Sequence, residues 1–409
     1  MNVKIRLLLI ALLPFAFAYG QREYIVTLDP SNFNFSKVDS LTRVKWINVP
    51  TSTFDHTNHR YIFQGMEADM VPKLYTVDAA TANIIYNPDF PVLPAGDNII
   101  NWQYSNSLHK LLGLHWNSVQ NLEYFVSVDF TTGAYNIIDT LPGVELISGS
   151  ATVDDINNRY IFNGGDTNGH FYLYSVDAST GAILSQPAFP VLADPLDNII
   201  EPEYGNATNK LYALHWDNSV STEYLISIDP VTGSHAIINS IPGVAWIQGG
   251  FTTFDEFHKR YMFKGGDNSG NWYLYSIDAV TGNVTYNPAF PVFAGDDNII
   301  MPETDSISGI TYALHWETVT GINEQANDHI RSFSPNPFTD NARITTDKQY
   351  KEITAFVYNV SGQMVKKETV YNSSEIVLSR DGLPEGSFFI SLVCDHVYGG
   401  TVKATILKQ

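Results

Sequence analysis

The triplet Leu114-His115-Trp116 recurs as Leu214-His215-Trp216 and as Leu314-His315-Trp316, each time after an interval of 100 residues. The same interval separates the members of three further sets, which are Tyr24, Tyr124 and Tyr224; Asp29, Asp129 and Asp229; and Val44, Val144 and Val244. A long fixed period indicates repeated supersecondary units, so it must be interpreted before any single segment. The sequence therefore predicts three copies of one large unit.

Each copy contains a weaker half-period of about fifty residues. Residues 173–181 resemble residues 225–233, and in both a β-branched and aromatic run ends in Asp-x-x-Thr-Gly. The Asp and Thr side chains can bond the turn backbone and the glycine allows a positive φ, so the pattern predicts a tight hairpin. Another hairpin is predicted upstream of each, and no helical periodicity follows the first twenty residues. Units of four short strands repeated radially are the blades of a β-propeller.

The number of units predicts how the ring closes. Whole units are found at residues 44–92, 98–144, 145–191, 198–244 and 245–292. Residues 23–41 match only the last two strands of a unit, and residues 298–316 match only the first two. Pairing these halves leaves no free sheet edge. The predicted fold class is all-β: a six-bladed β-propeller with a pseudo-threefold repeat and a split closing blade.

The first twenty residues have the features of a secretory signal peptide. Lys4 and Arg6 provide the positive start, and residues 7–17 form an apolar run too short to span a bilayer. Small residues predict cleavage before Gln21, with cleavage after Ala18 as the alternative. No later stretch is long and apolar enough to be a transmembrane segment, so we expect an exported, soluble mature chain.

Composition disfavours several classes of partner. The net charge of −20 disfavours nucleic acid and anionic lipid surfaces, which require basic patches. The chain has one cysteine, Cys394, so no internal disulfide can form and stability must come from packing. At 409 residues the chain is expected to form more than one domain.

The repeat ends after Trp316, and the remaining sequence has a different composition. We expect the propeller to comprise residues 21–319, followed by a polar linker at residues 320–332. In residues 333–409, roughly seven short alternating runs are separated by turns. This pattern predicts a small Ig-like β-sandwich as the last domain.

Three motifs in the last segment occur in a fixed order. They are Ser334-Pro335-Asn336-Pro337-Phe338, residues 358–365 (Tyr-Asn-Val-Ser-Gly-Gln-Met-Val) and residues 383–389 (Leu-Pro-Glu-Gly-Ser-Phe-Phe), before a basic finish at Lys403 and Lys408. This arrangement resembles the type A C-terminal sorting domain of the type IX secretion system. The resemblance implies a sorting motif that contains Pro335, Asn336, Pro337, Asn359, Gly362, Leu383, Pro384 and Gly386.

The resemblance also implies an export route and a partner. Sec export across the inner membrane is expected first, then passage across the outer membrane, with residues 333–409 contacting the type IX machinery. The product is expected to be secreted or attached at the cell surface, and in that family the domain is usually cleaved off after translocation. The propeller repeats resemble quinoprotein repeats only generically. The tryptophan that usually ends the quinoprotein hairpin is replaced at residues 182–184 and 234–236, so no quinone cofactor is expected.

The three His-Trp pairs could form a threefold site. In a strand, His215 shares a face with Leu211 and Ala213, and Trp216 lies on the opposite face. Three imidazoles could bind zinc, or three tryptophans could surround a sugar. These strands are second in each blade, however. We therefore expect the histidines to bond a neighbouring loop and the tryptophans to pack between blades.

The innermost strands are the better place for a ligand site, since they line the central channel. They are predicted to begin with the Asn-Ile-Ile runs, and this places Gln103, Glu203 and Glu303 in one register. Two carboxylates near an axis could hold a cation or act as an acid–base pair. The alternative is that channel water simply solvates them.

Other sequence motifs for chemistry are weak. Loops 164–169 and 265–270 contain Asp, Asn and Gly and could bind calcium, but they lack the glutamate of an EF-hand loop and such turns need no metal. No Gly-x-Ser-x-Gly, His-Glu-x-x-His or phosphate-loop motif occurs. We therefore predict a non-enzymatic protein that binds a glycan, protein or cation, with no required cofactor. The alternative is an extracellular polysaccharide hydrolase or lyase that uses Glu203 and Glu303.

Overall fold

The computed structural model describes residues 21–67, 69–190, 192, 197–291, 293, 298–318, 329–359, 363–395 and 397–407. The chain divides into two compact units, Met1–Thr318 and Val319–Gln409. The signal peptide predicted at residues 1–20 and most of the predicted linker lie outside the described residues. Apart from a 3-10 turn at Asn206–Thr208, every regular element that the structure describes is a β-strand. The protein is therefore all-β, as its sequence predicts.

The first unit contains six four-stranded antiparallel sheets. In hydrogen-bonded order, three of them are β3 (Trp46–Asp55), β4 (Arg60–Met66), β5 (Pro72–Asp78) and β6 (Ile84–Tyr86); β7 (Asn98–Ser105), β8 (Lys110–Asn117), β9 (Leu122–Val128) and β10 (Tyr135–Leu141); and β11 (Leu146–Asp154), β12 (Arg159–Gly165), β13 (Phe171–Asp177) and β14 (Ile183–Ser185). The other three are β15 (Asn198–Gly205), β16 (Lys210–Asp217), β17 (Thr222–Ile228) and β18 (His235–Ile241); β19 (Trp246–Asp255), β20 (Arg260–Gly266), β21 (Trp272–Asp278) and β22 (Val284–Tyr286); and β23 (Asn298–Thr304), β24 (Thr311–Thr318), β1 (Gln21–Leu28) and β2 (Phe35–Ser40).

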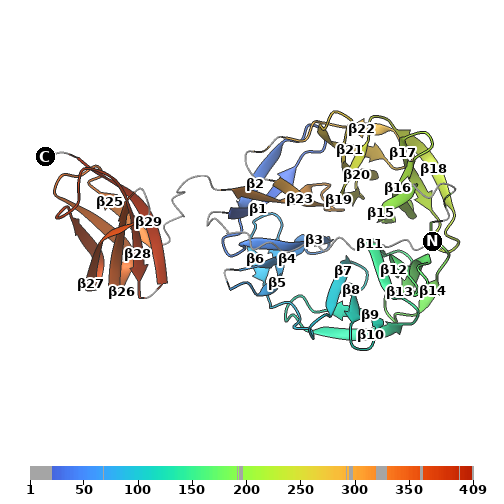
Figure 1. The fold of residues 1–409 in the computed structure, drawn as a ribbon, viewed down its shortest axis with the longest axis horizontal. Helices are drawn as coiled ribbons and strands as arrows, with labels where there is room; N and C mark the ends of the chain where they lie inside the picture. The colour runs from blue at the N-terminus through green and yellow to red at the C-terminus, as the bar shows by residue number, and fades with distance from the viewer. Residues whose placement is uncertain are drawn as a thin grey trace, which may run out of the picture. The chain divides into compact units, whose positions relative to one another are not determined.

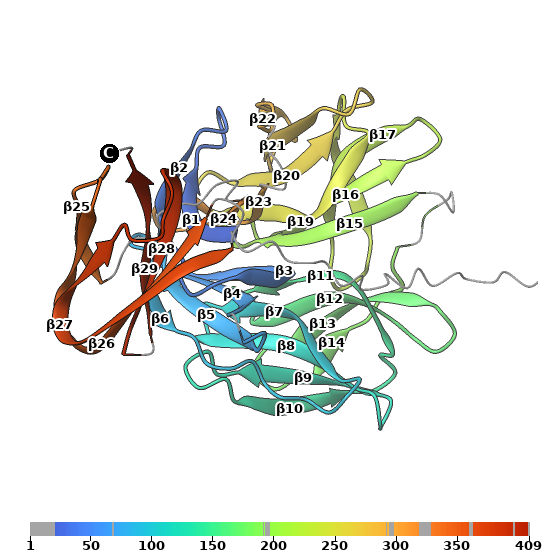
Figure 2. The same cartoon turned by 60° about the vertical axis from the view of Figure 1, so that its left-hand side comes forward.

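The first strands of these sheets form a closed ring (Figure 1). β3 contacts β7, and the contacts continue through β11, β15, β19 and β23 back to β3. The later strands of each sheet lie farther from the centre, and the turned view in Figure 2 shows the sheets following one another around it. This arrangement is propeller-like, and it places β7, β15 and β23 next to the axis.

Both ends of the first unit meet in one sheet. Its strand order is β2-β1-β24-β23, so the N-terminal strands pair with the C-terminal ones, as the half-units in the sequence predict. Tyr24 is opposite His315 and Leu28 is opposite Thr311 in this register. β1 is hydrogen-bonded on both sides, which leaves no free strand edge at the point where the ring closes.

The core of the first unit lies between neighbouring sheets. One buried cluster combines Tyr61 and Tyr75 from one sheet with Tyr312 and Leu314 from β24 of the closing sheet. Stacked aromatic pairs recur in alternate sheets: Phe63 with Tyr75 at 5.2 Å between ring centroids, Phe162 with Tyr174 at 5.0 Å and Phe263 with Tyr275 at 5.0 Å. Each such pair contributes about 0.5–1.5 kcal/mol beyond the area it buries.

The Asp-x-x-Thr-Gly segments form the tight turns that the sequence predicts. Asp177 Oδ1 accepts hydrogen bonds from the backbone N–H groups of Ser179 and Thr180 at 3.0 and 2.8 Å. Gly181 has a φ of 77°, and Gly233 in the related turn has a φ of 71°. Glycine adopts this left-handed conformation without steric cost, so the pattern marks the same hairpin throughout the unit.

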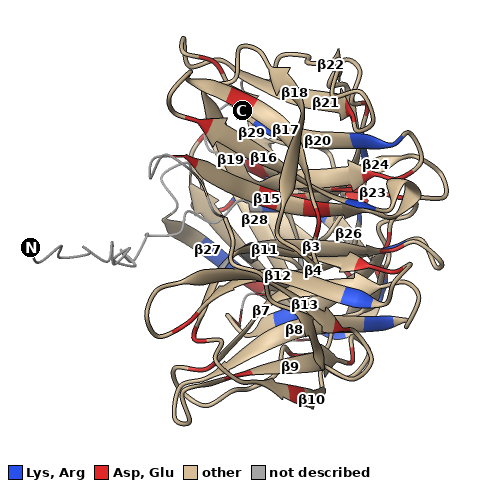
Figure 3. Ribbon diagram, turned by 90° about the vertical axis from the view of Figure 1, so that its right-hand side faces the viewer, with Lys and Arg blue, Asp and Glu red and all other residues tan. Residues whose placement is uncertain are grey.

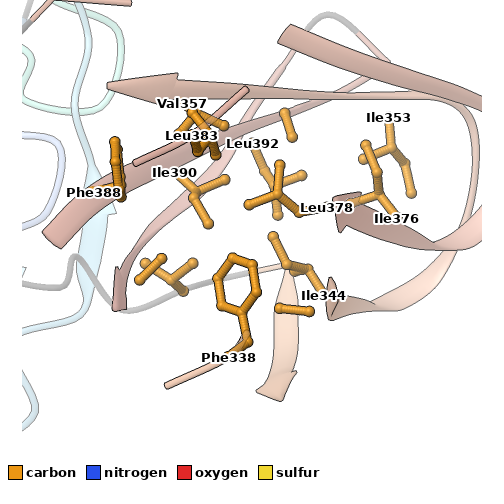
Figure 4. Packing of buried hydrophobic residues seen from close by; sticks show 14 of the residues in the cluster. Phe338, Ile344, Ile353, Val357, Ile376, Leu378, Leu383, Phe388, Ile390 and Leu392 are labelled. Carbon is orange, nitrogen blue, oxygen red and sulfur yellow. The ribbon is translucent and has the colours of Figure 1, made fainter. Parts of the chain in front are cut away.

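The second unit is a five-stranded sheet with two long strands. The strands are β25 (Ile330–Ser334), β26 (Asn341–Asn359), β27 (Met364–Ser379), β28 (Gly386–Cys394) and β29 (Val397–Ile406). β26 pairs with β25, β27 and β28, and side chains such as Phe338, Ile344 and Leu392 form a compact core (Figure 4).

The prediction of roughly seven short strands in this unit is wrong, because the described residues contain five. The register of β26 against β27 shifts between Thr345 and Tyr350, and the strand continues through this irregularity instead of ending there. β25 also begins at Ile330, so the sheet includes residues that the sequence assigned to the linker.

Candidate functional site

Three strands at the axis carry a bulge at the same position. The register of β7 against β8 shifts between Ile100 and Gln103, and β15 and β23 shift at the equivalent places. Asn101, Glu201 and Met301 lie in these bulges with φ values of 52°, 54° and 53°. Side-chain-bearing residues rarely adopt this left-handed conformation, so neighbouring groups must hold it in place.

A buried tyrosine from the next sheet of the ring holds each bulge. The tyrosine hydroxyls donate to backbone carbonyl oxygens in three pairs, which are Tyr160 to Asn101, Tyr261 to Glu201 and Tyr61 to Met301. All three tyrosine side chains are fully buried. Each tyrosine follows the arginine of a repeated Arg-Tyr pair. The repeat of about 100 residues therefore includes both the bulged strand and the tyrosine anchor that holds it.

Gln103, Glu203 and Glu303, the residues predicted to face the axis, come immediately after the bulges. They occupy equivalent register positions on β7, β15 and β23, opposite Leu112, Tyr212 and Tyr312 respectively. All three side chains are half-buried, so solvent reaches them. Their equivalent placement on the innermost strands agrees with the pattern in the sequence.

The two axial carboxyl groups lie in an environment that disfavours their charged forms. Burial raises the pKa of Glu303 to about 7, although a 2.7 Å hydrogen bond from Ser52 Oγ partly opposes this effect. Burial also raises the pKa of Glu203 well above its ordinary value, and the nearby charges of Glu303, Glu201 and Glu256 raise it further. No hydrogen bond to the Glu203 carboxyl is found within the part of the chain that the structure describes. Protonated carboxyl groups at neutral pH can donate as well as accept hydrogen bonds.

Two further acidic residues, Glu201 and Glu256, add to the negative potential around Glu203. The Thr252 hydroxyl donates to Glu201 Oε2, which joins β19 to β15. Glu256 accepts the backbone N–H groups of Asn206 and Ala207, both at 2.7 Å, and burial raises the pKa of its carboxyl group. The axis therefore offers an amide and several carboxyl groups, which suit hydroxyl groups better than an anion.

The described residues contain no group of three or more His, Cys, Asp or Glu side chains placed to hold a metal ion. The calcium candidates illustrate the reason. Asp166 Oδ1 accepts the backbone N–H groups of Asn168 and His170 at 2.9 Å, and these bonds lower the pKa of its carboxyl to about 2. Asp267 makes the same bonds to Ser269 and Asn271. In each loop one oxygen of the carboxylate thus closes the turn, so these turns form without a metal ion.

The His-Trp pairs do not come together in one site. Their strands β8, β16 and β24 belong to three different sheets. His115 is buried, with its Nε2 3.3 Å from Asp97 Oδ2, and His215 Nε2 lies 3.9 Å from Asp197 Oδ2. Asp97 belongs to the segment just before β7, so the expected bond from histidine to a neighbouring loop is present at His115. The packing role of the tryptophans stays a prediction.

Three buried glutamates, which are related to one another by the 100-residue repeat, were missed in the sequence analysis. Glu23, Glu123 and Glu223 are at most 3% exposed, and burial raises the pKa of each to about 8. At least one carboxyl oxygen of each lacks a hydrogen-bond partner among the described residues. They pair across the sheet with the tryptophans of the repeated triplets, at Trp316, Trp116 and Trp216. Their 100-residue spacing, one position before Tyr24, Tyr124 and Tyr224, was the available signal.

In the second unit, the motif residues occupy structural positions. Asn336 Nδ2 donates to the Lys403 carbonyl at 2.8 Å, and its Oδ1 accepts the Thr405 N–H at 2.9 Å. Asn359 Oδ1 accepts the Gln363 N–H at 2.9 Å, and Leu383 is buried in the core. Pro335, Pro337, Pro384 and Gly386 lie in or beside the connections of the sheet, and Gly362 lies outside the described residues.

These features define an all-β protein with a propeller-like unit and a separate sheet unit at its C-terminal end. Residues 332–403 match the family model of the secretion system C-terminal sorting domain, so this part of the chain is the sorting domain that its motifs predict. Such a domain implies contact with the type IX secretion machinery, and secretion or an outer-surface location. Within its described residues, the structure has no helix long and apolar enough to cross a membrane.

Among curated proteins, no significant match to the chain is found. Solved structures resemble its fold at low identity. A putative TolB from Agrobacterium tumefaciens is 11% identical with a TM-score of 0.51, and the match covers 73% of this chain and 99% of that one. An oligogalacturonate lyase from Vibrio parahaemolyticus is 10% identical with a TM-score of 0.46, over 73% of this chain and 98% of that one. At this identity the TolB similarity supports the propeller-like fold alone.

Proposed function

We propose that the protein is a non-enzymatic binding protein that the type IX system exports to the cell surface or the medium. The six sheets are, in this proposal, the blades of a six-bladed propeller with a pseudo-threefold repeat, and the second unit is an Ig-like sandwich that acts as the sorting signal. The ring of first strands and the match at residues 332–403 support it. The signal peptide expected at residues 1–20 provides the first membrane crossing.

One observation supports a ligand-binding site at the axis. Gln103, Glu203 and Glu303 occupy equivalent, solvent-reached positions on the three bulged strands of the axis. Concave sites with a few convergent polar groups on a rigid scaffold are the usual places for small ligands. The tyrosine anchors supply that rigidity at each bulge.

The ligand that suits these groups best is a neutral glycan. The Glu303 carboxyl, with a pKa raised to about 7, is partly protonated near neutral pH, and burial raises the pKa of the Glu203 carboxyl as well. Together with the Gln103 amide, such groups can donate to and accept from sugar hydroxyls. The net charge of −20, with acidic residues spread over the strands and loops (Figure 3), repels polyanions. We favour a glycan over a cation, because no group of three or more metal-ligating side chains occurs among the described residues.

The test is binding of the mature chain to a broad panel of neutral and acidic glycans. We expect at least one neutral glycan to bind. Glu203→Ala and Glu303→Ala should weaken this binding about tenfold or more, since each removes the polar atoms that would bond the sugar hydroxyls. Asp139→Ala, at an exposed position of β10, is the matched control and should bind normally. Absence of neutral-glycan binding, or full binding by both alanine variants, would overturn the axial site.

A second candidate function is polysaccharide hydrolysis or lyase chemistry at the same carboxyl groups. The pKa of Glu303, raised to about 7, is near the value that suits a general acid at neutral pH. This candidate predicts that Glu203→Gln abolishes product release without lowering the melting temperature. If the native chain cleaves no polysaccharide in the panel, the enzymatic candidate is lost while the binding proposal stands.

The export role is tested separately. Removing residues 333–409 should leave the first unit in the periplasm, because the machinery then has no sorting domain to recognise. Fractionation followed by immunoblotting measures this directly. Normal surface display of the truncated chain would contradict the role.

A further inference from the structure

One repeat differs from the other two around an arginine that all three share. Arg60, Arg159 and Arg260 begin equivalent strands, and in the strand register each lies opposite the aspartate that ends the next strand. The position that covers this arginine is found on the fourth strand of the sheet. It pairs with the third strand in the same register in all repeats, and it is occupied by Tyr86, Ser185 and Tyr286.

In two repeats a tyrosine ring lies over the arginine. The Arg60 Cζ is 5.8 Å from the Tyr86 ring centroid, and the Arg260 Cζ is 5.5 Å from that of Tyr286. A guanidinium over an aromatic face is attracted by the electron-rich ring. In the middle repeat Ser185 supplies no ring, and among the described residues no aromatic side chain stacks over Arg159.

A cleft of about 500 Å³ opens at this position. Its lining residues come from the β11–β14 and β15–β18 sheets, which are neighbours in the ring of Figure 1. Its walls include Arg159, Tyr204, Lys210, Pro230 and His235. Ser185 is at its edge, because its hydroxyl donates to the Pro230 carbonyl at 2.9 Å.

In the first repeat the corresponding space is filled by the protein's own aromatic rings. Phe130 stands where the middle repeat has Pro230, and its ring centroid is 6.1 Å from that of Tyr86 and 5.9 Å from that of Tyr104. The cleft at Arg159 is therefore a space that the same architecture elsewhere closes with aromatic side chains. Its volume lies within the range of roughly 300–1,000 Å³ that is common for ligand pockets.

The groups around the cleft are held in place. Arg159 Nε donates to Asp154 Oδ2 at 2.8 Å, Asp154 is fully buried, and the Arg159 side chain is 15% exposed. Tyr204 Oη donates to Asn209 Oδ1 at 2.6 Å, and Asn157 Nδ2 lies 3.2 Å from the same oxygen. The cleft thus combines an ordered guanidinium with a polar rim able to bond a phenol hydroxyl.

We propose that this cleft binds a tyrosine side chain of a partner polypeptide, with the ring against the Arg159 guanidinium. The class of ligand follows from the other repeats, where a tyrosine of the chain itself occupies the equivalent position. The site lies away from the axis, so it provides a second contact that does not depend on the axial carboxyl groups.

The test uses the mature chain and N-acetyl-tyrosinamide as the probe, with saturation-transfer NMR to detect binding in the millimolar range. N-acetyl-cyclohexylalaninamide is the matched saturated probe, because it keeps the size of the ring and removes its π face. We expect saturation transfer to the tyrosine probe, and at least threefold weaker binding of the saturated one. Equal binding of the two probes, or no transfer to the tyrosine probe, would overturn the proposal.

Protein variants place the binding in this cleft. Ser185→Tyr restores the residue of the other repeats and should abolish binding without lowering the melting temperature, whereas Gln186→Tyr, on the next and exposed residue, should leave it unchanged. Tyr286→Ser should uncover Arg260 and add a second site, seen as an increase in saturation transfer of up to twofold. Undiminished binding by a folded Ser185→Tyr variant would overturn the assignment. If that variant is unstable, Tyr286→Ser decides, and no gain in transfer would overturn it equally.

Discussion

Ser52 Oγ donates a 2.7 Å hydrogen bond to Glu303 Oε1, joining residues that are 251 positions apart in the sequence. The bond connects β3 of the first whole sheet to β23 of the closing sheet. It favours the charged form of a carboxyl group whose pKa burial raises to about 7. Protonation at the axis and closure of the ring are therefore coupled through this pair.

Ser52→Ala is expected to raise the pKa of Glu303 further above about 7, since the desolvation then acts unopposed. A carboxyl group with a raised folded-state pKa costs no stability below its unfolded pKa, and the cost grows as pH rises from that value to the folded-state pKa. The variant should unfold like the native protein at pH 4 and be about 1 kcal/mol less stable at pH 8. Denaturant unfolding at both pH values measures this, with Ser269→Ala as the surface control. An equal loss at both pH values would refute the coupling.

The buried glutamates predict a broader pH effect. Glu23, Glu123 and Glu223 have folded-state pKa values raised from 4.5 to about 8, so their penalty is absent at low pH and grows between roughly pH 4.5 and 8. Each pKa unit corresponds to about 1.4 kcal/mol. Glu123→Gln should therefore match the native melting temperature at pH 4 and exceed it at pH 9. Asp139→Asn, which is exposed on β10, should show no such difference, and a pH-independent effect of Glu123→Gln would contradict the prediction.

In the closing sheet, we expect that the two N-terminal strands can be supplied as a separate peptide. A chain that begins after residue 41 leaves β24 with a free edge, and we expect it to melt at least 10 °C lower and to self-associate. A peptide of residues 21–41 should restore the melting temperature, because it supplies β1 and β2. Thermal unfolding and size-exclusion chromatography measure both effects. Removal of the second unit, after Thr318, is the control and should leave the first unit's melting temperature unchanged.

The repeat makes much of the first unit predictable. A fixed interval assigns every strand to a sheet and pairs the half-units at the two ends, because equivalent residues must occupy equivalent register. It also places Gln103, Glu203 and Glu303 at equivalent register positions on the innermost strands. The bulges beside them were not predictable, because Asn101, Glu201 and Met301 share no residue type and depend on tyrosines about sixty or more positions away.

Neither the cleft beside Ser185 nor the strand lengths of the second unit can be predicted from the sequence alone. Ser185 is an ordinary residue until the register reveals that a tyrosine covers an arginine at that position in the other repeats. In the second unit, apolar alternation predicts strands correctly but not their lengths. A strand that continues through an irregularity, as β26 does near Tyr350, has the same local pattern as two shorter strands.

In the sorting domain, position 336 needs a side chain that both donates and accepts a hydrogen bond, as asparagine does. Its side chain donates to the Lys403 carbonyl and accepts the Thr405 N–H, so it ties the segment before β26 to β29. Asn336→Asp loses the donor and sets a carboxylate against a carbonyl oxygen, which should destabilise the second unit by about 0.5–1.5 kcal/mol, since Asn336 is exposed and water can bond the groups left without a partner. Asn341→Asp, on an exposed residue of β26, is the matched control.

Differential scanning calorimetry of the Asn336→Asp chain should show a lower transition for the second unit and an unchanged one for the first, because the two units are separate cores. The exported fraction should fall in parallel, since the machinery must then recognise a partly unfolded domain. Rescue of export at lower temperature would indicate that Asn336 acts by stabilising the fold. Loss of export with an unchanged transition would instead show that the machinery contacts Asn336 itself, and would contradict the structural role that its two hydrogen bonds predict.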